Sequence, residues 1–139
     1  MAMRIKLSVI ALVAMILPEQ ARAATLTAAE ATFLDQLVTA AAVLEQRCTG
    51  YEVDGTGGVQ AGASLLGSPN AAMEMIAAYD AAIKANDGNA YDATKFRPEV
   101  FEAAIKTFKR LQAELIKNPK EACADYGNAG VSSGLLRRF

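Results

Sequence analysis

One apolar spacing occurs twice in this 139-residue chain and constrains its fold more than any other feature. Apolar residues follow one another at offsets of 0, 3, 4, 7, 10 and 14, from residue 34 to 48 and again from 101 to 115. The first set is Leu34, Leu37, Val38, Ala41, Leu44 and Cys48, and the second is Phe101, Ala104, Ile105, Phe108, Leu111 and Leu115. Such residues share one face of an α-helix. Because convincing strand patterns are missing, the sequence predicts an all-α, single-domain bundle with three main helices and one or two short ones.

Capping residues give the limits of the first two main helices. Thr27 and Glu30 have the spacing of a capping box, so we expect the first helix to run from about Thr27 to Arg47. Ser68, followed by a proline, is a good start for the second helix, and Asp87, followed by a glycine, is a good end.

The third main helix and a short fourth helix make up the C-terminal part. Pro98 suits the first turn of the third helix. Asn118 with Glu121 three residues later is a second capping signature, and the short helix that it starts should end at Gly127. Residues 128–139 contain two glycines and two serines and are expected to form a loosely held tail.

Six of the ten glycines lie between residues 49 and 68. Asp54-Gly55 and Gly57-Gly58 are turn signals, and one or two helical turns are expected further on, closed by Gly67. We interpret residues 49–68 as a glycine-rich surface loop, because long loops of this kind are often functional.

The N-terminal segment has the layout of a secretory signal peptide. Two basic residues, Arg4 and Lys6, precede an apolar run from Leu7 to Leu17, and a small-x-small site ends at Ala23. The run is 11 residues long, whereas a membrane span needs about 20. We therefore expect residues 1–23 to be removed during export, with an uncleaved membrane anchor as the alternative.

Removal of the signal leaves a mature domain of residues 24–139, with 11 basic and 14 acidic side chains and a net charge of −3. A mildly acidic domain lacks the positive field that nucleic-acid binding requires. No stretch of the mature domain is apolar over the length of a membrane span. We expect no nucleic-acid partner and no stable membrane span after cleavage.

The two cysteines, Cys48 and Cys123, both lie in the mature domain. In an oxidising compartment, an even pair in a small domain indicates a disulfide bond. Two free thiols or an intermolecular bridge are the alternatives. A tyrosine follows three residues after each cysteine, and we expect Tyr51 and Tyr126 to pack beside the bridge.

The chain contains no histidine, which removes the most common general base and the most common zinc ligand. The cysteines lack the spacing of a redox motif, and no phosphate-binding glycine loop with its lysine is present. We therefore expect no catalytic residues, no metal site and no cofactor.

Two groups of charged residues are candidate partner surfaces. Glu52 and Asp54 border the glycine-rich segment, and paired carboxylates can hydrolyse glycosides. Lys106, Lys109 and Arg110 lie beside the apolar stripe of the third main helix, where they suit an acidic partner or remain a solvated face.

These observations favour a non-enzymatic, periplasmic binding protein of the cell envelope, with another envelope or secreted protein as its partner. The alanine-rich helices and the signal layout favour a Gram-negative envelope. In general design the chain resembles the acid-stress chaperones of that compartment, being small, helical, exported and disulfide-bonded. The alternative is a cell-wall glycan hydrolase, or an accessory factor to one, that uses Glu52 or Asp54.

The signal prediction fixes the first residue of the exported protein. We expect the mature chain to begin at Ala24, because cleavage follows the small-x-small site. Intact mass spectrometry of the exported product checks this. A mass corresponding to all 139 residues in the membrane fraction would contradict it.

Overall fold

The computed structural model describes residues 25–46 and 48–139, and within them the chain forms five helices and one two-stranded sheet. The elements in chain order are α2 (Ala28–Glu45), β1 (Tyr51–Val53), α3 (Gly55–Leu66), α4 (Pro69–Asn86), α5 (Pro98–Lys117), α6 (Pro119–Ser133) and β2 (Leu136–Arg138). The all-α prediction is confirmed. The predicted signal peptide, residues 1–23, lies outside the described residues.

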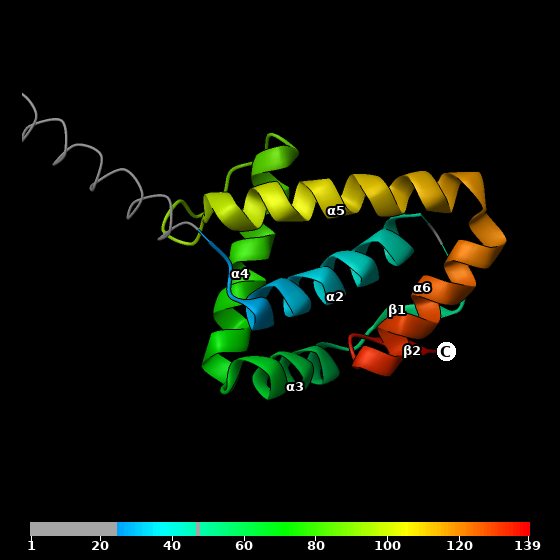
Figure 1. Ribbon diagram of the computed structural model, residues 1–139, viewed down its shortest axis with the longest axis horizontal. Coiled ribbons are helices and arrows are strands. Elements are labelled where there is room, and N and C mark those ends of the chain that lie inside the picture. The colour runs from blue at the N-terminus through cyan, green and yellow to red at the C-terminus, as the bar shows by residue number, and fades with distance from the viewer. Residues whose placement is uncertain (1–24, 47) are drawn as a thin grey trace, which may run out of the picture.

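Helix α2 is the centre of the bundle. It packs against α3, α4, α5 and α6, and Figure 1 shows it passing between α5 on one side and α3 on the other. Its buried residues are Phe33, Leu34, Val38, Ala40, Ala42 and Val43, which occupy more than one face. The predicted stripe is therefore only part of the buried surface, because a helix with neighbours on several sides buries more than one stripe.

The caps predicted at Thr27 and Ser68 are present, whereas Asn118 precedes α6 without making the predicted side-chain capping hydrogen bond. The Thr27 hydroxyl accepts from the Glu30 amide at 3.1 Å, and the Glu30 carboxylate accepts from the Thr27 amide at 3.0 Å. Ser68 caps α4 by accepting from the Ala71 amide at 3.1 Å. Asp87 follows the last residue of α4, as expected.

The prediction of a loop is wrong for most of residues 49–68, although helical turns are present before Gly67 and end there, as expected. The segment begins with β1 and continues as a 12-residue helix, α3, which Asp54 caps by accepting from the Gly57 amide at 2.9 Å. Gly50 and Gly67 have positive φ values and lie in a turn and at the end of α3, whereas Gly62 permits a close contact between helices. A Cβ atom on Gly62 would lie 2.6 Å from the Phe33 ring of α2 and 2.6 Å from Ala72 of α4.

The prediction of a loosely held tail at residues 128–139 is also wrong. Helix α6 starts at Pro119 as predicted but continues past Gly127 to Ser133. Leu136 is buried, and its strand β2 pairs antiparallel with β1. Gly127 lies against the Tyr51 ring of β1, so this glycine makes room for the sheet and does not end the helix.

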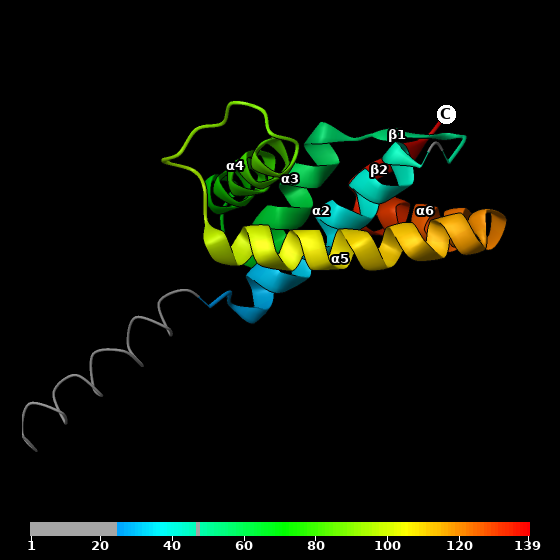
Figure 2. The ribbon, with the colours of Figure 1, turned by 90° about the horizontal axis from the view of Figure 1, so that it is seen from above.

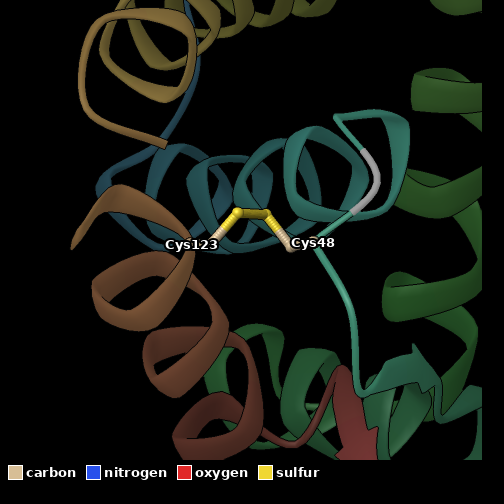
Figure 3. The surroundings of a disulfide bond; sticks show 2 residues. All are labelled: Cys48 and Cys123. Carbon is tan, nitrogen blue, oxygen red and sulfur yellow. A yellow bond between two sulfur atoms is a disulfide. The ribbon is translucent and has the colours of Figure 1, made fainter. Parts of the chain in front are cut away.

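The predicted disulfide between Cys48 and Cys123 is confirmed (Figure 3). It joins the segment after α2 to α6, with 5.5 Å between the two α-carbons. Tyr51 lines the shallow depression around the bridge, whereas the Tyr126 hydroxyl donates to Glu114 of α5. Figure 2 shows the sheet beside α6 at one end of the molecule and the connection between α4 and α5 at the opposite end.

The close approach of α2, α3 and α4 generates a stability prediction. Gly62→Ala should lower the free energy of unfolding by about 1–3 kcal/mol, because the new methyl group overlaps Phe33 and Ala72. Gly55→Ala is the matched control, since nothing lies within 4 Å of a Cβ atom there. Chemical denaturation of both variants measures the difference. Equal stabilities would contradict the packing role of Gly62.

Candidate functional site

An apolar groove runs between α2, α3, α4 and the end of β1. Its volume is about 250 Å³. The groove is lined by Leu37, Ala40, Ala41 and Leu44 of α2, Val53 and Asp54 at the end of β1, Gly55 and Gly58 of α3, Ile76 of α4, and Leu135. Among the described residues of this lining, Asp54 is the charged one. We refer to these residues as the apolar groove.

The groove is open because glycines and partly exposed apolar side chains line it. Gly55 and Gly58 carry no side chain that could fill the space. Leu37 and Leu44 are only half-buried, and Val53 remains 60% exposed. An apolar hollow in contact with water is unfavourable by itself, and such surfaces mark interaction sites. The sequence stripe of α2 therefore supplies a surface as well as a core.

Strand β1 has an edge that does not pair with β2. Tyr51, Glu52 and Val53 lie opposite Arg138, Arg137 and Leu136. The Asp54 amide donates to the Leu135 carbonyl, and the Phe139 amide donates to the Gly50 carbonyl. These two bonds show which residue pairs of the two strands are hydrogen-bonded and which are not. Since antiparallel residues alternate between bonded and non-bonded pairs, the amides and carbonyls of Tyr51 and Val53 point away from β2. That free edge adjoins the groove through Val53.

The two predicted carboxylates each have a structural partner. Glu52 Oε1 accepts from the Arg137 guanidinium at 2.7 Å across the sheet. Asp54 caps α3 and lines the apolar groove. Asp54 thus belongs to the groove lining and Glu52 does not, and each carboxylate has a contact that explains its position without chemistry.

The predicted basic residues lie elsewhere. Lys106, Lys109 and Arg110 are exposed on α5. Figure 1 shows α5 and α3 on opposite sides of α2, so the structure does not bring these residues together with Glu52 and Asp54. Lys106, Lys109 and Arg110 form a second, separate candidate surface.

An ion cluster that no local sequence pattern predicts lies at the N-terminal end of α2. The Arg97 guanidinium lies 2.7 Å from Glu30 of α2 and 2.7 Å from Glu99 of α5. The Arg97 side chain lowers the pKa of Glu30 through its hydrogen bond, and Glu30 in turn raises the pKa of Arg97. Glu30 and Arg97 are 67 residues apart, and no local pattern links them. The cluster fixes the N-termini of α2 and α5 to each other.

Comparisons with protein-family models, curated proteins and solved structures found no match. Among residues 25–46 and 48–139, every helix is too short or too polar for a membrane span.

The ion cluster predicts a defined acid response. Because the folded-state pKa of Glu30 is lowered, its contribution to stability is present above the ordinary value of 4.5 and is lost as the pH falls through the lowered value. Arg97→Met should destabilise the protein at pH 7 by about 1 kcal/mol, and the difference from wild type should narrow in acid.

The control for this prediction is Lys84→Met. It removes the exposed pair between Lys84 and Asp80 within α4 and should change stability little. Denaturant unfolding gives the stability of wild type, Arg97→Met and Lys84→Met from about pH 7 down to about pH 3. Carboxylates titrate within this range. A constant difference between Arg97→Met and wild type across this range would show that Glu30 is not the responsible group.

Proposed function

We propose that this protein is an exported, non-enzymatic binding protein of the cell envelope that holds an extended apolar segment of another polypeptide. The apolar groove beside the free edge of β1 carries this proposal. The two features lie next to each other, and together they offer the two kinds of contact that an extended segment can make.

The binding mode follows from strand geometry. A segment added along Tyr51–Val53 gains main-chain hydrogen bonds from the free edge. Its side chains alternate between two faces, so every second residue is directed to the same side. Val53 places that side at the groove, where Leu37, Leu44 and Ile76 contact an aliphatic side chain. The main chain provides affinity, and the groove selects apolar residues.

The proposed location rests on the signal layout and the disulfide. Export through a cleaved signal would deliver Cys48 and Cys123 to an oxidising periplasm, where their bond persists. A chaperone-like form of the proposal adds an acid response. With its carboxylates protonated, the mature domain retains 11 basic residues, whose mutual repulsion would loosen the bundle around the groove.

A labelled peptide of alternating isoleucine and threonine tests the proposal. We expect saturable binding by fluorescence anisotropy, and at least about tenfold weaker binding to Leu37→Gln, because a buried amide in the groove is unfavourable. Ile116→Gln is the matched control, since Ile116 is 66% exposed on α5 and does not line the groove. A peptide with alternate residues replaced by proline should not bind, because proline removes the donors that pair with the edge.

Equal binding by both variants, or undiminished binding of the proline peptide, would contradict the proposal. If a second copy of the chain occupies the groove instead, the free protein should self-associate, and Leu37→Gln should weaken that association. Light scattering measures the association of both proteins. The glycan hydrolase alternative predicts turnover of purified cell-wall glycan that is lost in Glu52→Gln.

A further inference from the structure

Glu52 is the middle residue of β1, between the two residues whose amides and carbonyls form the free edge. Side chains alternate along a strand, so Glu52 lies on the opposite face of the sheet from Tyr51 and Val53. The Tyr51 ring lies against Gly127 of α6, so Tyr51 and Val53 are on the face toward the bundle. The Glu52 side chain is 44% exposed on the outer face. A carboxylate therefore stands on the outer face of the strand that carries the free edge.

The register of the sheet determines how Glu52 would meet an added antiparallel strand. Glu52 and Arg137 form a hydrogen-bonded pair of the ladder, because the bonds of the Asp54 and Phe139 amides lie two residues to either side. Toward the free edge the alternation is reversed, so the two neighbours of Glu52 form the bonded pairs and Glu52 forms a non-bonded pair. The α-carbons of a non-bonded pair are only about 4.5 Å apart, which brings the two side chains close together.

The Glu52 carboxylate keeps an oxygen available for a second cation. Its Oε1 accepts from Arg137 Nε at 2.7 Å, and within the described residues its Oε2 has no hydrogen-bond or ion-pair partner. Arg137 belongs to β2, on the side of β1 away from the free edge. A residue opposite Glu52 on an added strand would be one strand spacing of about 4.8 Å from β1 and two spacings from β2. Because Coulomb energy falls with distance, the carboxylate outweighs the guanidinium at that position.

We infer that the free edge of β1 selects segments in which a lysine or arginine stands between two apolar residues. This inference rests on the proposed function, and it names the chemistry of the partner segment. The residues opposite Tyr51 and Val53 share the face of those two side chains and are directed to the groove side, where apolar residues fit. The residue between them faces Glu52. Opposite charges across two strands stabilise their pairing, and like charges directly opposite destabilise it.

The test compares three labelled peptides that differ at one position. Each carries two isoleucines separated by a single residue, with serine-rich flanks, and the residue between the isoleucines is lysine, threonine or glutamate. Fluorescence anisotropy measures their binding to the disulfide-bonded protein. We expect the lysine peptide to bind about two- to fivefold more tightly than the threonine peptide, and the glutamate peptide to bind more weakly by a similar factor. These differences should shrink at about 1 M salt, which screens charges beyond about 3 Å.

Two variants separate the charge of Glu52 from the integrity of the sheet. Glu52→Gln and Arg137→Gln both break the ion pair between β1 and β2, so any loosening of the sheet is common to them. Glu52→Gln should abolish the preference for lysine, whereas Arg137→Gln should widen it, because the carboxylate then has no competing cation. Glu102→Gln is the control for net charge, since Glu102 is exposed on α5, and it should leave the order of the peptides unchanged.

The outcomes distinguish this inference from the proposed function. Equal binding of the three peptides, or a lysine preference that persists in Glu52→Gln, would overturn the inference and leave peptide binding standing. A preference lost equally in Glu52→Gln and Arg137→Gln would also overturn it, because damage to the sheet would then be the cause. Absence of binding by all three peptides would overturn the proposed function and this inference with it.

Discussion

The insertion of Phe33 between α3 and α4 is the contact on which the rest of the fold depends. Phe33 is fully buried, and Gly62 and Ala72 are the residues that its ring meets on the two neighbouring helices. A glycine inside a helix costs about 1 kcal/mol relative to alanine. Here the cost is offset by dense packing around a large ring, which α3 could not approach with a side chain at that position. Large residues on α2 and small residues on its neighbours therefore determine how closely the helices can approach.

The sequence predicted the features that depend on nearby residues. The apolar period, the capping box at Thr27 and the serine cap at Ser68 are local signals, and the structure contains each of them. The pairing of Cys48 with Cys123 was predictable because only one intramolecular connectivity exists. The features that failed depend on distant partners. Glycines such as Gly62 and Gly127 usually indicate loops or helix ends. Here they lie inside helices because the rings of Phe33 and Tyr51 pack against them and leave no room for a side chain.

At the candidate site, too, the sequence predicted local features and missed those that depend on distant segments. The sequence identified Leu37 and Leu44 as apolar positions of a helical stripe. The stripe alone does not show whether other residues cover these two side chains. That depends on α3, whose first turns present Gly55 and Gly58 to the groove, and on the position of β1. The free edge of β1 could not be predicted from the sequence. The strand that pairs with β1 lies in residues 128–139, for which composition predicted a loosely held tail. A groove between four elements is a property of the tertiary arrangement and not of any one segment.

Helix α2 is held at both ends, which bears on how it can serve a binding site. At its start, Arg97 links Glu30 to the beginning of α5, and after its end the Cys48–Cys123 bond links the chain to α6. Between these two links, one face of α2 lines the apolar groove. Association is weakened when a protein must order its own surface to bind, and a surface fixed beforehand avoids that cost. The covalent and ionic links that restrain α2 would therefore favour the peptide binding that we propose at the apolar groove, although neither link lies in the groove lining.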